Sequence, residues 1–248
     1  MHKRRKVEQV PEMVVMSCVQ PRFTGTTIAP TSPRLHRLKT GEDNEAHCRI
    51  LVLPDVLNSE VLETYLKSSQ AVKRVQAPGV FGHAKPRLEL CYTPSGAPYK
   101  YSGRKQETTT FPAHVVAVLP TLMARVQRHI PSNHYTVTSN AVDICYDARQ
   151  TRGGSIGAHS DDEEDWGLVL IYSLGQTRWL RLRDKTTLEF TNVALTHNSL
   201  VAMHGRDFQR SFTHQIDKLS LNEPIGMRLS LNVRFHDDRD ARTALVQE

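Results

Sequence analysis

Residues 228–235 read RLSLNVRF and alternate polar and apolar side chains with a period of two. Because successive side chains of a β-strand point to opposite faces, this period predicts a strand with two unlike faces. The apolar face, which is expected in the core, consists of Leu229, Leu231, Val233 and Phe235. The opposite face consists of Arg228, Ser230, Asn232 and Arg234.

The two arginines of this strand are the first indication of a ligand. Burial of a guanidinium in an apolar body is costly unless an anion accompanies it. Arginine binds carboxylates through two parallel hydrogen bonds and always keeps its charge, so a dicarboxylate co-substrate would suit this face. The alternative is an ordinary surface face whose arginines form salt bridges.

Other segments of the second half also have the length and composition of short strands separated by turns. They are residues 135–146, 167–174, 178–183, 187–193 and 198–204. The first half has a different character, with helical patterns before the strands begin. This order predicts an α+β fold with a β-sandwich or jelly-roll body.

The first half contains one strand and two helices by the same criteria. Residues 48–57 predict a strand entering a turn, and residues 59–69 predict a helix capped by Ser59, with Glu63 near the capping-box position. Residues 111–130 predict a second helix that Pro120 kinks or divides. Residues 71–103 contain short β-like pieces broken by proline and glycine.

Residues 1–45 are rich in proline, threonine, serine and basic groups and predict a disordered tail. Residues 1–40 hold eight basic and two acidic residues, which accounts for the whole net charge of +6. The basic balance therefore describes the tail and is poor evidence for a basic groove in the body. The run Lys3-Arg4-Arg5-Lys6 resembles a nuclear localisation signal, so a nuclear or cytoplasmic protein is expected, with the nucleus favoured.

Several protein classes fit this composition poorly. The chain has no apolar run near the roughly 20 residues that span a bilayer, and its charged N-terminus has no apolar stretch behind it, so neither a membrane span nor a secretory signal is expected. The four cysteines form no C-x-x-C pair and are expected as reduced thiols. A monomer is expected.

The segment His159-Ser160-Asp161 is an H-x-D motif. On an extended strand both side chains face the same way and can meet one metal ion. Two histidines and one carboxylate leave three coordination positions open, as non-haem Fe(II) oxygenases require. Three later histidines could complete the set: His197, His204 and His214. A second H-x-D at His236 has no histidine after it.

The run HSDDE (159–163), a strand block, SFTHQI (211–216) and then R-x5-R (228–234) together resemble the AlkB family, in the branch that removes alkyl groups from nucleic-acid bases. The resemblance covers about residues 75–236 and implies a double-stranded β-helix, or jelly-roll, core with flanking N-terminal helices and a β-hairpin recognition lid. It implies a domain over 46–240, with the lid about 75–104, the core about 135–236 and a short tail at 241–248.

The resemblance also implies a ligand set with Fe(II), 2-oxoglutarate and O2 as cofactors. His159, Asp161 and His214 would bind iron. Arg228 would bind the far carboxylate of 2-oxoglutarate, and Arg234 would lie at its metal-proximal end. The remaining co-substrate residues would be Tyr146, Ser230 and Asn232. The chain departs from the family at Ser230 and Ile144, where asparagine is usual.

The stretches VFG (80–82), PRLELCY (86–92) and PYKYSG (98–103) resemble the lid of the DNA-repair members, in which aromatic residues stack on a flipped base. Tyr99, Tyr101 and Ser102 would line the base pocket, and Phe81 would fill the gap that the flipped base leaves. Buried core positions are the alternative for these aromatics. The other implied substrate-binding residues are Arg87, Asp162 and Glu163, the latter two having a solvated acidic loop as their alternative.

The activity that the resemblance implies is oxidative demethylation of alkylated bases in DNA or RNA, with release of succinate, CO2 and formaldehyde. A nucleic acid is the implied partner. Two other hypotheses remain open at this point. One is an Fe(II)/2-oxoglutarate hydroxylase that acts on protein, lipid or a small molecule, and the other is a catalytically inactive nucleic-acid-binding module.

Overall fold

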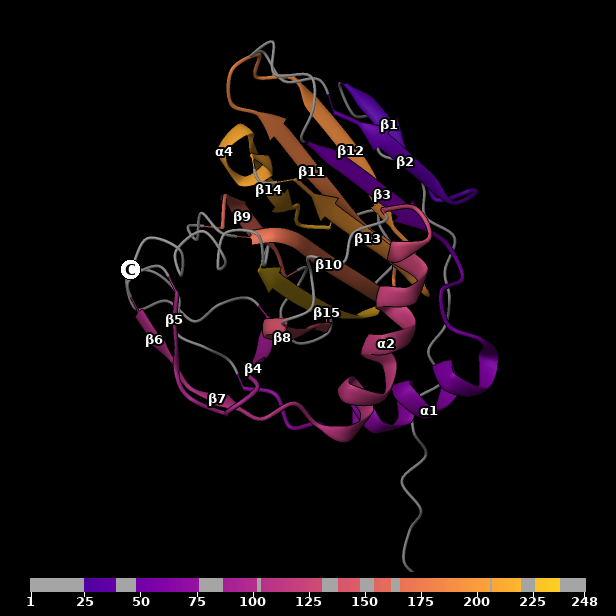
Figure 1. Ribbon diagram of the computed structural model, residues 1–248, viewed down its shortest axis with the longest axis vertical. Coiled ribbons are helices and arrows are strands. Elements are labelled where there is room, and N and C mark those ends of the chain that lie inside the picture. Colours follow the sequence, from indigo (N-terminus) through magenta and orange to yellow (C-terminus); the bar gives the residue numbers. More distant parts are fainter. Residues whose placement is uncertain are drawn as a thin grey trace, which may run out of the picture.

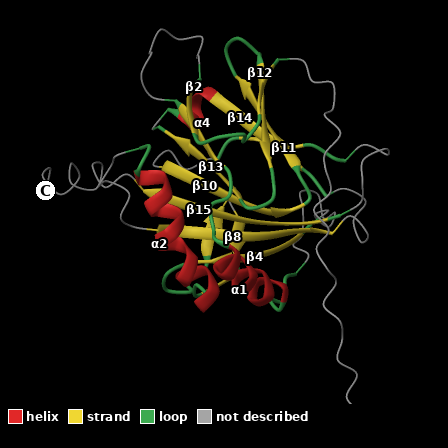
Figure 2. Cartoon of the chain, turned by 90° about the vertical axis from the view of Figure 1, so that its right-hand side faces the viewer, coloured by secondary structure: helices red, strands yellow, loops and turns green. Residues whose placement is uncertain are grey.

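The computed structural model describes residues 25–38, 48–75, 87–101, 104–130, 138–147, 154–161, 166–205, 207–219 and 226–236. The described chain contains many β-strands and few helices, an architecture compatible with the jelly-roll core expected from the sequence. Two sheets pack face to face, and two helices cover the other face of the larger sheet (Figures 1 and 2).

The larger sheet has eight strands and contains the motif strand at residues 227–236 as β15. Its order is β2 (Arg34–Arg37), β3 (Arg49–Leu53), β13 (Ser199–His204), β10 (Trp166–Gly175), β15 (Met227–His236), β8 (Thr138–Asp147), β4 (Leu88–Tyr92) and β7 (Thr108–Thr109). The register places Ser230 between Ser173 of β10 and Ile144 of β8. The five second-half segments predicted as strands correspond to β8, β10, β11, β12 and β13.

The smaller sheet has five strands and faces the larger one. Its order is β1 (Thr26–Ile28), β12 (Phe190–Leu195), β11 (Arg178–Asp184), β14 (Phe212–Ile216) and β9 (Ile156–His159). A short helix, α4 (Phe208–Ser211), leads directly into β14. Alternate side chains of both sheets meet in one apolar cluster, for example Ile50 and Val169 from the larger sheet and Leu182 from the smaller. Burial of this cluster holds the two sheets together.

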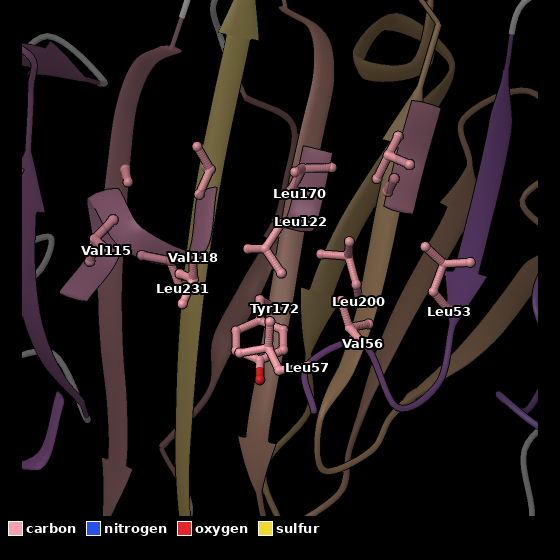
Figure 3. Close-up of a cluster of buried hydrophobic side chains, with 14 of the residues drawn as sticks. Leu53, Val56, Leu57, Val115, Val118, Leu122, Leu170, Tyr172, Leu200 and Leu231 are labelled. Atoms are coloured by element: carbon pink, nitrogen blue, oxygen red, sulfur yellow. The ribbon is translucent and has the colours of Figure 1, made fainter. Parts of the chain in front are cut away.

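A second apolar cluster lies between the larger sheet and the helices α1 (Ser59–Gln70) and α2 (Ala113–Gln127). In Figure 3, Val118 and Leu122 of α2 lie against Leu231 and Leu170 of the sheet. The apolar face predicted for β15 is confirmed, because its four members are each at most 2% exposed: Leu229, Leu231, Val233 and Phe235.

The helices differ from the sequence prediction at two points. The N-cap of α1 is Asn58, whose Oδ1 accepts a hydrogen bond from the Val61 amide at 2.9 Å, so the prediction that Ser59 caps this helix is wrong. Asparagine is as good a cap as serine, and it precedes Ser59 by one residue. The second helix runs through Pro120 and is not divided there.

The prediction that all of residues 1–45 are disordered is also wrong. Thr26–Ile28 pairs in parallel with β12, and Arg34–Arg37 pairs with β3. Ile28 is buried in the apolar cluster between the sheets. Gly25 has a φ of +100°, and a side chain there would collide with the carbonyl oxygen of Phe190. A polar composition concealed these short edge strands, which gain stability from strands that follow them in the chain, β3 in one case and the distant β12 in the other.

Other elements of the sequence prediction lie partly outside the described residues. At the end of the range expected for the lid, and extending beyond it, β5 (Tyr99–Tyr101) and β6 (Arg104–Gln106) form a two-stranded antiparallel hairpin. The cysteines Cys48, Cys91 and Cys145 are free thiols. None of the helices in the described part is long and apolar enough to span a membrane.

We predict that Asn198→Ala destabilises the fold by about 2–4 kcal/mol. Asn198 is buried with a left-handed φ of 54°, and its Oδ1 accepts hydrogen bonds from the Leu57 amide and the Tyr172 hydroxyl. Its Nδ2 donates to the Leu57 carbonyl at 2.8 Å. Urea unfolding measures the change, and Val116→Ala, at a residue that is 53% exposed, should shift the free energy of unfolding by less than about 0.5 kcal/mol. Equal effects of the two substitutions would contradict this role.

Candidate metal centre and co-substrate cavity

Three side chains from the H-x-D segment and β14 meet at one point between the sheets. His159 is the last residue of β9 and is the register partner of His214 on β14. Their ring centroids are 4.2 Å apart. Asp161 follows two residues after the strand ends, and one potential ligand atom from each of the three residues lies within 4.8 Å of the others. These residues can hold one metal ion.

The structure separates His214 from the two other histidines that could complete the set. His197 accepts a hydrogen bond from the Gly175 amide through Nδ1, at 3.0 Å. His204 directly follows Met203 on β13, and Met203 lines the cavity, so His204 points to the opposite face of the sheet. Within the described residues, the grouping suited to a metal is therefore His159, Asp161 and His214.

The ring of His159 is oriented for metal binding by its own strand. Nδ1 lies 2.8 Å from the carbonyl oxygen of Gly157. Because a carbonyl can only accept, Nδ1 must carry the proton, which leaves the lone pair of Nε2 for a metal. Nε2 lies 3.9 Å from Oδ1 of Asp161, on the side where the three ligands converge.

Asp161 is 3% exposed and is held on both its side chain and its backbone. Arg234 donates to both carboxylate oxygens, with Nε 3.0 Å from Oδ2 and Nη2 3.1 Å from Oδ1. The Asp161 amide donates to Oε1 of Gln209 at 3.0 Å. Burial alone would raise the pKa of the carboxyl, but the charge and hydrogen bonds of Arg234, together with His214 and His159, outweigh burial and hold the pKa of Asp161 well below its usual range. The residue is therefore a carboxylate, as a metal ligand must be.

His214 is buried, with 7% of its surface exposed, and its environment favours the neutral imidazole. Burial, followed by the nearby His159, lowers the pKa of His214 to about 3. Its Nδ1 is buried and makes no hydrogen bond within the described part of the chain. A buried neutral imidazole beside a second imidazole and a carboxylate is the donor set of the facial triad that binds Fe(II), so the residues present fit this metal.

The ligands border a cavity of about 100 Å³ between the two sheets. Strands β4, β8 and β15 form much of one wall, and β9 and β14 contribute to the other. Arg228 lines this cavity and is 1% exposed. Its Nη2 lies 3.1 Å from the Ser173 hydroxyl and 3.3 Å from that of Ser230. A permanent cation thus stands at the opposite end of the β15 face from Arg234, as the spacing R-x5-R requires.

The predicted co-substrate residues have different outcomes. Ser230 and Asn232 line the cavity with Arg228 and Arg234. Ile144, at a position where the family usually has asparagine, also lines it. Asp143 points away from the cavity. On the helix side of the sheet, its Oδ2 lies 2.7 Å from Nη2 of Arg74. Tyr146 is the register partner of Arg228, but its side chain lies outside the described residues.

The predicted substrate residues are described only in part. Arg87 lines the cavity. Tyr99 and Tyr101 belong to β5, but their side chains are not among those described. Four predicted residues lie outside the described ranges: Phe81, Ser102, Asp162 and Glu163.

Two residues of the site were missed in the sequence. Gln209 supports the backbone of Asp161 from α4, and Glu89 lines the cavity beside Arg87. Glu89 alternates with Arg87 and Cys91 along a short strand, which is only a weak signal of a shared face. Gln209 has no local pattern that distinguishes it from a surface residue.

Comparisons with known proteins agree with this geometry. A family model described as "2OG-Fe(II) oxygenase superfamily" matches residues 49–234, which include all three metal ligands and both arginines of β15. A crystal structure of an oxidoreductase of the 2OG-Fe(II) oxygenase family from Burkholderia pseudomallei is similar in fold, with a TM-score of 0.54 and 12% identity. The similarity covers 75% of this chain and 85% of that chain. No curated protein matches the sequence.

We predict that Gln209→Leu weakens metal binding by roughly tenfold or more, the usual cost of losing a group that orients a ligand. The substitution leaves the buried Asp161 amide without its acceptor. Titration with Mn(II) or Zn(II) measures the dissociation constant. Gln70→Leu, at the end of α1, is the matched control and should keep the native value. Equal metal affinities in the two variants would contradict a positioning role for Gln209.

We also predict that the metal-free protein loses stability as pH falls from about 6.5 toward 3. The pKa of His214 is about 3 in the fold and 6.5 in the reference state, so across this window the unfolded chain binds a proton that the fold does not. The slope contributed by this one group approaches about 1.4 kcal/mol per pH unit.

Urea unfolding in a chelating buffer between pH 4.5 and 6.5 provides the test. His214→Asn should flatten the slope, whereas Val116→Ala, which removes no titratable group, should leave it unchanged. An unaltered slope in the His214 variant would show that this imidazole is not held neutral by burial.

Proposed function

Because this chain belongs to the 2OG-Fe(II) oxygenase superfamily and is an Fe(II)- and 2-oxoglutarate-dependent dioxygenase, we propose that its substrate is an alkylated base in DNA or RNA. One observation carries the choice of substrate. The metal cavity is bordered by Glu89 and Cys91 of β4 and by Arg87, which directly precedes β4, and β4 is the strand that leads toward the β5–β6 hairpin. Residues 86–103, which contain β4 and β5, resemble the base-recognition lid of the dealkylating branch.

His159, Asp161 and His214 hold the iron in this proposal and leave one side of it open to the cavity. Arg228 binds the far carboxylate of 2-oxoglutarate, helped by the hydroxyls of Ser173 and Ser230. Arg234 keeps Asp161 ionised and fixed. When bound, iron and 2-oxoglutarate supply the oxidation of a substrate C–H bond by O2, with release of succinate and CO2.

The protein's own contribution is to position the reactants and exclude water. The cavity is lined by apolar side chains between these charged groups, including Ile156, Val169, Ile171, Leu180 and Met203. A base can reach a metal buried between two sheets only after it leaves the helical stack, which costs a few kcal/mol and favours damaged or single-stranded nucleic acid. Hydroxylation of an N-methyl group gives a product that releases formaldehyde and restores the base.

We predict that the purified protein, given Fe(II), 2-oxoglutarate and an oligonucleotide containing N1-methyladenine, releases succinate and formaldehyde. His159→Ala should reduce both products at least 100-fold, because it removes a metal ligand. Glu189→Gln, on the exposed loop before β12, should behave as the native protein. Mass spectrometry of the oligonucleotide and colorimetric assay of formaldehyde measure the reaction.

The two products distinguish the alternatives. Formaldehyde that requires both the oligonucleotide and His159 would support the demethylase. Succinate without formaldehyde would keep the dioxygenase and exclude this base as its substrate, which would favour a hydroxylase acting on protein, lipid or a small molecule. If the metal-loaded protein released neither succinate nor formaldehyde, this result would contradict the proposed activity.

A further inference from the structure

The wall of the cavity formed by β4 carries an ion pair. Nε of Arg87 lies 2.5 Å from Oε1 of Glu89. The two side chains are only 14% and 7% exposed, and both line the cavity that contains the metal ligands and Arg228. A buried carboxylate is unexpected in a cavity that receives a dicarboxylate, because like charges repel more strongly away from water.

Arg87 also joins the two sheets. Its Nη1 donates to the carbonyl oxygen of Ser155 at 3.0 Å, and Ser155 directly precedes β9, the strand that carries His159. The guanidinium therefore spans the gap between β4 of the larger sheet and β9 of the smaller one. Its position beside Glu89 is fixed from two sides.

The register places Glu89 near the carboxylate-binding end of the cavity. Glu89 pairs with Ile144, Ile144 with Ser230, and Ser230 with Ser173. Arg228 donates to the last two of these residues. Neighbouring strands are about 4.8 Å apart, so a carboxylate on Arg228 would lie roughly 10 Å from Glu89. Ile144, between them, is apolar and offers no hydrogen bond.

We propose that the Arg87–Glu89 pair sets the affinity of the co-substrate site, with Arg87 acting as a positioning residue through Glu89. Arg87 neutralises Glu89, which would otherwise repel the far carboxylate of 2-oxoglutarate. Glu89 in turn keeps the Arg87 guanidinium turned to the wall, so that the co-substrate carboxylate binds at Arg228. The inference rests on the proposed role of Arg228 and is independent of which substrate is oxidised.

We predict that substitutions of the two residues change the affinity for 2-oxoglutarate in opposite directions. Arg87→Met should weaken 2-oxoglutarate binding roughly tenfold, the effect expected of removing one positive charge at about this distance. Glu89→Gln should strengthen binding, because it removes the negative charge and releases the positive one. The double variant should return to within about threefold of the native dissociation constant. A purely structural ion pair would instead weaken binding in both single variants.

Calorimetric titration of the full-length, Mn(II)-loaded protein measures these dissociation constants, with thermal unfolding of each variant recorded alongside. Repeating the titration with 2-oxopentanoate, which lacks the far carboxylate, should abolish the opposite shifts. If Arg87→Met does not fold, Arg87→Gln replaces it, because its amide can still donate to Ser155. Lys67→Met, on the exposed side of α1, controls for loss of a surface cation.

The outcomes distinguish failure of the proposed role of the Arg87–Glu89 pair from failure of the co-substrate role assigned to Arg228. Loss of binding in both single variants, or a double variant as weak as Arg87→Met, would overturn the proposal. Arg228→Met should lose 2-oxoglutarate binding in any case. If it does not, the assigned co-substrate role of Arg228 fails, whereas failure of the base-demethylation assay alone leaves the role of the pair intact.

Discussion

The hydrogen-bonded register between β9 and β14 is the constraint on which the site depends. It sets His159 directly opposite His214, although 55 positions separate them in the chain. Strand pairing of this kind is specific to one residue, because a slip by one would turn every side chain to the other face. The apolar cluster between the sheets enforces the register, since Phe212 and Ile216 of β14 are buried in it. The core thus fixes the geometry of the metal site.

Paired charges allow ionised groups to remain in this apolar interior. Asp161 is matched by a bidentate contact from Arg234, and Glu89 is matched by Arg87. The helix side of the larger sheet follows the same rule, with Asp143 bound to Arg74. Ionised groups are tolerated in such surroundings only when an opposite charge and hydrogen bonds replace water. Each buried carboxylate therefore remains ionised only while the fold holds its arginine partner in place.

Local pattern was sufficient for elements whose stability comes from an alternating or amphipathic face. The strand at 228–235 was predicted with both faces correct, because its period of two is visible within eight residues. The strands β1 and β2 were missed because they have few apolar residues and depend on β12 and β3 for their hydrogen bonds. The cap at Asn58 was missed by one residue, since two good capping residues stand side by side.

Residue types and spacing in the sequence were enough to indicate the class of chemistry, because an H-x-D motif and two arginines on one strand face suggest a metal site and an anionic co-substrate. That His214, and not His197 or His204, lies beside His159 and Asp161 depends on the pairing of β9 with β14, about which sequence distance carries no information. Packing also placed Gln209 against the backbone of Asp161, 48 residues away along the chain, and Glu89 in the wall of the cavity. Contacts between strands depend on register and on the path of the chain, and no local pattern specifies them before the sheets have packed.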